Sequence, residues 1–369
     1  MIPFGDPSAS YQTHKSEIDQ AIKRVLDSGW YVLGTEVNEF EKEFASFHGK
    51  VFHAVGVANG TDAIALCLRA LGLGTEDEII TSSHTAVATV AGIEQAGCTP
   101  VFADIDPNTR CIDPNSIKGR VGSKTRAIMP VHIYGQPAEM IRILEIAKTH
   151  NLAVIEDCSQ AHGAEIRGQK VGTFADISAF SCYPTKNLGG TGDGGVILCR
   201  SKEFAEEIKS LRQYGWNEER VCITPGFNSR LDELQAAILR VKLRHLSDDN
   251  SKRRSIALRY NEELKDLPIT LPALARNQLH AMHLYVIECD RRNELMKYLR
   301  SHQIGASLHY PLAVHQQTAY AHRIRGGDNL PVTDQFYEKN LTLPMYPELS
   351  NDTVGHIISM VQKWFREET

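Results

Sequence analysis

The chain has 369 residues, of which 42% are hydrophobic and 23% are charged, and its formal net charge is −5 at pH 7. This composition is typical of a folded globular protein, and the small negative charge disfavours a role in binding nucleic acid. Because the length exceeds the size at which one hydrophobic core usually stops growing, we expect two domains. They are a large domain at 1–248, N-terminal helix included, and a smaller one at 249–369.

The sequence lacks the features of a secreted or membrane protein. Its N-terminus has no charged start followed by an apolar stretch, and no run approaches the roughly 18 apolar residues that a membrane helix needs. The eight cysteines include no Cys-x-x-Cys pair and mostly lie in apolar or strand-like runs. We therefore expect buried free thiols, no metal site and a cytoplasmic location.

Short apolar runs alternate with helical patterns in the first part of the chain. Strands are expected at 53–58, 78–81, 98–105, 125–132 and 152–156. The helices between them are expected to end near 71 and to span 85–96, 114–121 and 137–149. This alternation predicts the α/β class, with a mainly parallel sheet covered by helices on both faces.

Two further strands are expected at 176–181 and 195–199, separated only by a glycine-rich loop. The loop contains Gly190-Thr-Gly-Asp-Gly-Gly195, which formally matches a dinucleotide-binding fingerprint. That fingerprint leads from a strand into a helix, whereas here a β-branched strand follows, so a nicotinamide site is disfavoured. We interpret the glycines as turns where the backbone passes close to a ligand.

Long helical patterns dominate from residue 229 onward. Apolar spacing predicts helices at 231–246 and about 250–264, and Ser229 with Asp232 and Glu233 resembles an N-terminal cap. The elements expected for the small α/β domain are a strand at 281–289, a helix at 292–302 and a terminal helix from 354.

The turn Asn59-Gly60-Thr61-Asp62 joins the first expected strand to the helix after it. A phosphate there would meet free backbone N–H groups and the positive end of a helix, with the Thr61 hydroxyl as a further donor. Thr and Asp are also common helix caps. The turn alone therefore does not distinguish a phosphate site from a plain cap.

Asp157 closes the fifth expected strand, and Lys186 follows in the glycine-rich loop. Ligands of open α/β sheets bind beyond the carboxyl ends of the strands, so Asp157 is expected to face the same crevice as Thr61, with Gln160 near enough to reach a cofactor substituent. A lysine amine can condense with an aldehyde, and a carboxylate can hold a pyridine nitrogen protonated. Together they predict pyridoxal phosphate, although a lysine in a loop is most often simply solvated.

Three separated segments begin at Glu156, Phe180 and Gly226 and read EDCSQAHGA, FSCYPTKNLGG and GFNSRLDELQAA. Shorter ones are IPF near the start, SGWYVLG at 28–34 and HYP at 309–311. Together they resemble the DegT/DnrJ/EryC1/StrS family of pyridoxal-phosphate sugar aminotransferases, over nearly the whole chain. The resemblance implies the type I fold of aspartate aminotransferases, with a mostly parallel seven-stranded sheet and a smaller C-terminal α/β domain.

The resemblance also implies a role for each matching residue. Lys186 would bind the cofactor aldehyde and act as the general base, Asp157 would pair with the pyridine nitrogen, and Gln160 would lie beside the phenolic oxygen. The residues implied at the phosphate are Gly60, Thr61, Ser181 and, from a neighbouring subunit, Asn228. A homodimer with shared active sites follows, with L-glutamate as the usual amino donor of the family.

The substrate is expected to be a nucleotide-linked ketosugar. Segments 131–140 and 160–163 are similar to the branch of the family that acts at C-3 of 3-keto-6-deoxyhexoses, so we favour a dTDP-linked 3-ketosugar. Amination at C-4 of a UDP- or GDP-linked sugar stays open. The side chains expected to line the sugar pocket or to meet a diphosphate are Tyr183, Tyr134, His162, His309, Tyr310 and Arg230.

One position departs from the family pattern. Many members carry an aromatic residue in the segment equivalent to 83–86, where its ring stacks on the cofactor, but this chain has Ala86. His84 is a candidate for that flat face and equally for a solvated or capping residue. A sugar dehydratase of the same fold is disfavoured because such relatives replace the lysine by histidine. A non-catalytic pyridoxal-phosphate-binding regulator is the remaining alternative.

Overall fold

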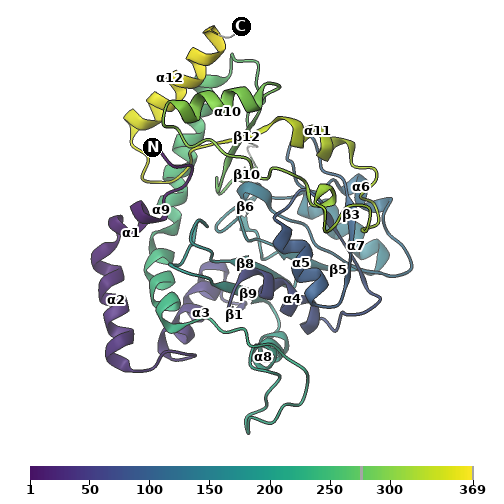
Figure 1. Cartoon of the computed structure of the whole chain (residues 1–369). Coiled ribbons are helices and arrows are strands. Elements are labelled where there is room, and N and C mark those ends of the chain that lie inside the picture. Colours follow the sequence, from purple (N-terminus) through teal and green to yellow (C-terminus); the bar gives the residue numbers. More distant parts are fainter. Residues whose placement is uncertain (275–276, 368–369) are drawn as a thin grey trace.

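In the computed structural model, which describes residues 1–274 and 277–367, a seven-stranded sheet forms the base of the molecule (Figure 1). The strand order is β1-β9-β8-β5-β4-β2-β3. Only β9 runs antiparallel to its neighbours. The mostly parallel seven-stranded α/β sheet is therefore confirmed. Its strands are β1 (His53–Val57), β2 (Glu78–Ser82), β3 (Thr99–Ala103), β4 (Thr125–Ile128), β5 (Ala153–Asp157), β8 (Ile177–Ser181) and β9 (Gly195–Cys199).

Both faces of the sheet are covered by helices, as the apolar strands require. Alternate residues of β8 enter different cores: Ile177 and Ala179 pack on one face, and Phe180 packs on the other. The first face is covered by α4 (Gly60–Ala70), α5 (Val87–Gln95) and α8 (Lys202–Leu211). The second face is covered by α3 (Thr35–His48), α6 (Pro114–Lys118), α7 (Met140–His150) and α9 (Glu233–Leu264).

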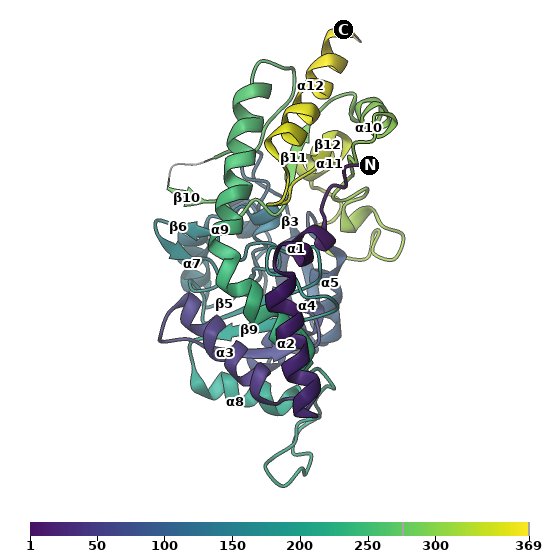
Figure 2. The same cartoon turned by 90° about the vertical axis from the view of Figure 1, so that its left-hand side faces the viewer.

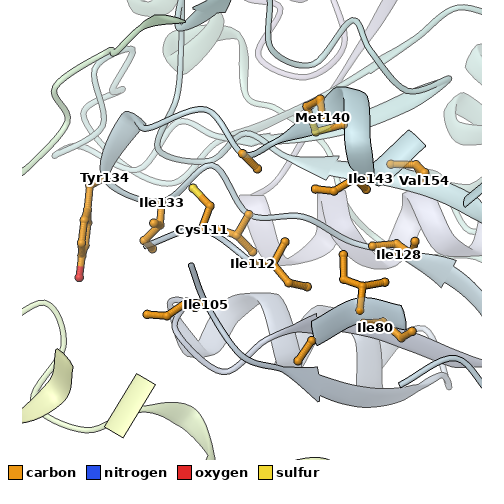
Figure 3. Close-up of a cluster of buried hydrophobic side chains, with 14 of the residues drawn as sticks. Ile80, Ile105, Cys111, Ile112, Ile128, Ile133, Tyr134, Met140, Ile143 and Val154 are labelled. Atoms are coloured by element: carbon orange, nitrogen blue, oxygen red, sulfur yellow. The ribbon is translucent and has the colours of Figure 1, made fainter. Parts of the chain in front are cut away.

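A cluster of buried aliphatic side chains lies between β2, β4, β5 and the helix α7 (Figure 3). Ile80, Ile128 and Val154 come from the strands, and Met140 and Ile143 come from α7. Tyr134 lies at the edge of this cluster with its hydroxyl pointing away from it (Figure 3). The cluster therefore leads from the hydrophobic core to the edge of the sheet where the strands end.

The helix α9 differs from its expectation, because it is one helix of 32 residues rather than two. The polar stretch between the two expected helices contains no proline or glycine, and Asn250 there is 2% exposed and hydrogen-bonded, so nothing breaks the helix. The expected cap is wrong in part: Asp232 is the N-cap, whereas the Ser229 hydroxyl accepts a hydrogen bond from the Ala58 N–H.

A second core lies around the C-terminal half of α9. It is built by Tyr260 and Leu264 of that helix with the antiparallel pair β11 (Tyr285–Glu288) and β12 (Asn340–Leu343). The helices α10 (Arg292–Ser301) and α12 (Asn351–Glu367) complete it. Since α9 passes without interruption through residue 248 (Figures 1 and 2), a division of the chain at that point stays a prediction.

The N-terminal segment joins this second core rather than the sheet. Ile2 forms a parallel bridge with Ile304, and the Phe4 carbonyl accepts a hydrogen bond from the Met345 N–H. The remaining elements are α1 (Pro7–Thr13), α2 (Lys15–Ser28), β6 (Glu165–Ile166), β7 (Gln169–Lys170), β10 (Gln278–Leu279), α11 (Pro331–Lys339) and the short 3-10 helices at Ile133–Gly135 and Val314–Gln316.

The structure bears on two expectations drawn from the sequence, the state of the cysteines and the presence of a membrane helix. All eight cysteines are free thiols, seven of them buried and Cys222 exposed. Within the described ranges, no helix has the length and apolar character needed to cross a membrane.

Glu233, at the start of α9, holds the N-terminus of α3 through hydrogen bonds, and its replacement tests this contact. Its carboxylate is 3% exposed and accepts the N–H groups of Gly34, Glu36 and Val37 at 2.7 to 2.9 Å, at the N-terminus of α3. Replacement by alanine leaves three donors unpaired, two of them buried, so we expect Glu233→Ala to lower the free energy of unfolding by about 3 kcal/mol. Urea denaturation followed by circular dichroism measures this loss.

Glu262→Ala is the matched control, because Glu262 lies on the same helix and its only described partner is the exposed Lys265. We expect the control to unfold near the wild-type urea midpoint. Equal midpoints for the two variants would contradict the anchoring role of Glu233.

Candidate active site

The segments that carry the predicted site residues meet at the carboxyl edge of the sheet. β1 leads there into α4, and β5 ends there at Asp157. The antiparallel β9 begins at the same edge, so the loop that joins β8 to β9 stays there with Lys186. A Cβ on Gly60 would lie 2.6 Å from the Ser181 Cβ, so only glycine allows these two implied phosphate residues to approach so closely.

Asp157 is held by one hydrogen bond on each carboxylate oxygen. The Thr89 hydroxyl donates to Oδ2 at 2.8 Å, and the Ser159 N–H donates to Oδ1 at 3.0 Å. Asp157 is 3% exposed, and donors of this kind favour the charged form of a buried carboxyl group. Each oxygen keeps a further lone pair for a ligand.

Glu156 points to the opposite face of β5 and has its own partners. Its carboxylate accepts the N–H groups of Gly172, Phe174 and Ala175 and lies 3.1 Å from His132 Nε2. His132 Nδ1 accepts the Ala138 N–H, so the imidazole is neutral and donates from Nε2. These hydrogen bonds fix the end of β5.

Gln160 links the segment after β5 to two tyrosines. Its Oε1 accepts the Tyr134 N–H at 2.7 Å, and its Nε2 donates to the Tyr310 hydroxyl at 3.0 Å. The Tyr134 hydroxyl in turn donates to the His309 carbonyl. These contacts orient the Gln160 amide and leave its second Nε2 proton for another acceptor.

Lys186 lines a cleft of about 320 Å³ together with Tyr183, His309 and Tyr310. Burial lowers the pKa of its amine from 10.5 to about 8, and the negative charge of Asp157 opposes part of that shift. An unprotonated amine is the form that attacks a carbonyl carbon. Lys186 is therefore a partly buried lysine of lowered pKa at the carboxyl edge of the sheet.

Asn187 and Asn250 fix the orientation of a further imidazole in this cleft. Asn187 Nδ2 donates to Asn250 Oδ1 and to the Ala281 carbonyl, so Asn187 Oδ1 accepts from His283 Nδ1, 3.1 Å away. Burial, with the nearby Lys186 charge second, keeps the pKa of His283 well below its usual value. His283 therefore presents an unprotonated Nε2 in the cleft that contains Lys186.

The implied phosphate residues separate into two groups. Gly60 and Thr61 form the first turn of α4, where the Asn59 side chain caps the helix by accepting the Asp62 N–H. Asn228 lies instead on the exposed segment after α8, where it pairs with Gln213. It does not line the cleft of its own chain.

The expected sugar-binding residues do not all lie in the cleft. Tyr183, His309 and Tyr310 line it. Arg230 and His162 do not: His162 is 1% exposed and packs against Phe180, and burial lowers its pKa to about 3. Tyr134 is 6% exposed and does not line the cleft; its hydroxyl donates a hydrogen bond to the carbonyl of His309, which does.

His84 is neither solvated nor a cap. It is fully buried, its ring packs edge-on against Tyr134, Phe336 and Tyr337, and its Nδ1 lies 3.1 Å from the Tyr337 hydroxyl. Burial lowers the pKa of His84 to about 3. Because these contacts occupy the ring and it does not line the cleft, the structure gives no support to His84 as the stacking residue.

The glycines of the loop between β8 and β9 approach protein atoms. A Cβ on Gly190 or Gly192 would collide with the Gln235 side chain, and one on Gly195 would collide with the Asn59 backbone. Their close contacts within the chain are therefore with α9 and with the turn before α4, and an approach to a ligand stays a prediction. These contacts fix the part of the loop that follows Lys186.

Four residues of the site were not predicted, and three of them carry no local sequence signal. Thr89 lies inside a helix, and His283 lies inside an expected strand, where each looks like packing. Arg253 is 7% exposed and donates from Nη1 to the carbonyls of Met282, His283 and Met345. Asn187 is the exception, because it directly follows Lys186 and could have been tested as its neighbour.

Comparison with known proteins identifies the family of the chain. Residues 12–362 match the DegT/DnrJ/EryC1/StrS aminotransferase family, so the chain belongs to that family and is an aminotransferase. It is 43% identical, over 99% of both chains, to the dTDP-3-amino-3,6-dideoxy-alpha-D-galactopyranose transaminase of Aneurinibacillus thermoaerophilus.

Two solved structures are similar along the chain. The structure of Streptomyces venezuelae DesV in complex with a ketimine intermediate has a TM-score of 0.96 and 41% identity, over 99% of both chains. That of NtdA from Bacillus subtilis with bound cofactor PMP has a TM-score of 0.88 and 30% identity, over 96% of this chain and 82% of that one.

The lowered pKa of Lys186 predicts a pH dependence for its reactivity. With a pKa of about 8, about half of the amine is unprotonated at pH 8, whereas an ordinary lysine with a pKa near 10.4 is less than about 1% unprotonated there. Acylation of Lys186 by acetic anhydride in the cofactor-free protein should rise with pH and level off above about 9. Peptide mass spectrometry after labelling at each pH measures this profile. A midpoint near 10.4 would contradict the effect of burial.

Proposed function

We propose that this aminotransferase uses pyridoxal phosphate to move an amino group from L-glutamate to C-3 of a dTDP-linked 3-keto-6-deoxyhexose. The observation that carries the proposal is the pairing, at one edge of the sheet, of a lysine with a pKa of about 8 and a buried aspartate. The relative from A. thermoaerophilus, named for a dTDP-3-amino sugar, supports the nucleotide and the carbon position.

The residues present fit this cofactor. Lys186 would bind its aldehyde carbon, Asp157 its ring nitrogen, and the second Nε2 proton of Gln160 its phenolic oxygen. The phosphate would lie at the first turn of α4, against Gly60, Thr61 and Ser181. When bound, the cofactor supplies a ring that accepts the electron pair released when a C–H bond next to nitrogen is broken.

The protein's part is to move one proton and to hold one charge. Once the amino donor has displaced it, the Lys186 amine is free to take a proton from the donor carbon and return it to the cofactor carbon. A pKa of about 8 suits this task near neutral pH. Asp157, held in place by Thr89 and Ser159, would pair with the protonated ring nitrogen.

The sugar would enter through the cleft beside Lys186. Tyr183 is 52% exposed at its rim, and His309 and Tyr310 lie deeper with Lys186. Burial, with the Lys186 charge second, lowers the pKa of His309 to about 4, so its imidazole is neutral and suited to hydrogen-bond a sugar hydroxyl. Arg230 does not line this cleft. We propose that it contacts the diphosphate of the sugar nucleotide outside the cleft.

We include a homodimer with shared sites in the proposal. Large apolar side chains are exposed at Trp30, Tyr31, Val221 and Ile223, from 51% to 68%, which is unusual for a surface that faces water. The segment after α8 that carries two of them also carries Asn228 and projects from the body (Figure 1). A second copy would cover these side chains and bring its Asn228 to the phosphate. A cytoplasmic location is part of the same proposal.

Lys186→Ala tests the chemistry. Wild-type protein with pyridoxal phosphate and L-glutamate should form pyridoxamine phosphate and 2-oxoglutarate, detected by absorbance and by mass spectrometry. The variant lacks the amine that moves the proton, so we expect the half-reaction to slow by at least about a thousandfold with the fold unchanged. Full activity of Lys186→Ala would refute this role.

The same measurement covers the alternatives. A non-catalytic regulator would bind pyridoxal phosphate without any half-reaction. A panel of dTDP- and UDP-linked 3- and 4-ketosugars with the pyridoxamine phosphate form then separates amination at C-3 from amination at C-4.

A mixing experiment tests the shared site. Lys186→Ala destroys the site to which that subunit gives its lysine, and Asn228→Asp places a negative charge against the phosphate of the other site. In a heterodimer of the two variants, one site carries both defects and the other carries neither. Random mixing should therefore restore about a quarter of wild-type activity per dimer. No recovery above the sum of the separate variants would show that each site is built from one chain.

A further inference from the structure

Two hydroxyl groups form a hydrogen-bonded chain behind Asp157, and the proposed mechanism uses only the one on Thr89. The Thr89 hydroxyl lies 2.8 Å from Asp157 Oδ2, and the Thr85 hydroxyl lies 2.6 Å from that of Thr89. The three side chains are between 1% and 3% exposed. No solvent therefore competes for these hydrogen bonds.

The direction of these hydrogen bonds follows from the charge of Asp157. An ionised carboxylate only accepts, so the single Thr89 proton must point at Asp157. The Thr89 oxygen can then only accept from its neighbour, so Thr85 donates to Thr89. The chain Thr85 to Thr89 to Asp157 is thus polarised toward the carboxylate, and protonation of Asp157 would remove the reason for that order.

The backbone around Thr89 adds to the same effect. Thr89 lies in the first turn of α5, whose N-cap residue, Ala86, has no side chain that could cap the helix. The positive end of the helix is therefore not neutralised by a capping side chain. Thr89, in the first turn at that end, is the residue that contacts Asp157.

We propose that Thr89, supported by Thr85, is the positioning residue that holds the Asp157 carboxylate in the orientation that meets the cofactor ring nitrogen. The inference rests on the proposed function, because it requires that nitrogen to be present. Thr89 holds Oδ2 from one side and the Ser159 N–H holds Oδ1, so the carboxylate cannot rotate. The remaining lone pairs are then directed to the ligand.

Replacement of the ring nitrogen provides the test. We expect Thr89→Val, which keeps the side-chain shape and removes the hydroxyl, to weaken the binding of pyridoxal phosphate to the full-length protein about tenfold. Binding of 1-deazapyridoxal phosphate, in which C–H replaces the nitrogen, should change by less than about twofold. Equilibrium dialysis of both cofactors measures the two dissociation constants. Equal weakening for both cofactors would overturn the proposal.

Three further variants separate a positioning role from a packing role. Thr89→Ser retains the hydroxyl and should restore the affinity for pyridoxal phosphate. Thr85→Val should weaken it in the same nitrogen-dependent way, by a smaller factor. Thr81→Val is the matched control, because the Thr81 hydroxyl is fully buried and donates to the Met129 carbonyl instead. A nitrogen-dependent loss in Thr81→Val would overturn the proposal.

The outcome for the wild-type protein keeps the two hypotheses apart. If it fails to retain pyridoxal phosphate, the proposed function falls, and this inference falls with it. If the wild-type protein retains the cofactor and Thr89→Val loses affinity equally for both cofactors, only the role of Thr89 is refuted.

Discussion

The burial of two consecutive carboxylates at the end of β5 is the constraint on which the site depends. Glu156 and Asp157 point to opposite faces of the sheet, and both are at most 3% exposed. A buried charge without partners would cost several kcal/mol, so each requires its own set of donors. Glu156 fixes the turn at 172–175, and Asp157 fixes the start of α5. The charges that make the strand end reactive thus also order the segments around it.

The reversed direction of β9 completes the arrangement. A parallel connection after β8 would carry the chain away to the opposite edge of the sheet through a helix. Because β9 is antiparallel, the short loop that bears Lys186 stays at the edge where Asp157 ends. Contacts of Gly190 and Gly192 with Gln235 hold that loop against α9. The amine is therefore kept in a partly desolvated position, which is the reason for its low pKa.

Many of the strands and helices could be predicted from local sequence. The predictions that were wrong each have a particular structural cause. The strands of the sheet were predicted within a few residues because apolar runs and their turn residues are local signals. The break expected near residue 248 failed because polar residues can continue a helix when one of them, Asn250, is buried and hydrogen-bonded. The Ser229 cap failed because its hydroxyl accepts instead from Ala58, far away in the sequence.

The sequence alone indicated the α/β class and the family. It also indicated that Lys186 and Asp157 serve the same site, because each lies in a contiguous motif of that family. Tertiary packing decided which side chains share the cleft. It placed Tyr183, His309 and Tyr310 beside Lys186, left His162 and His84 in the core, and brought Thr89 to Asp157 across 68 residues of chain. Such contacts depend on how distant helices and strands pack, and no spacing within a segment encodes that.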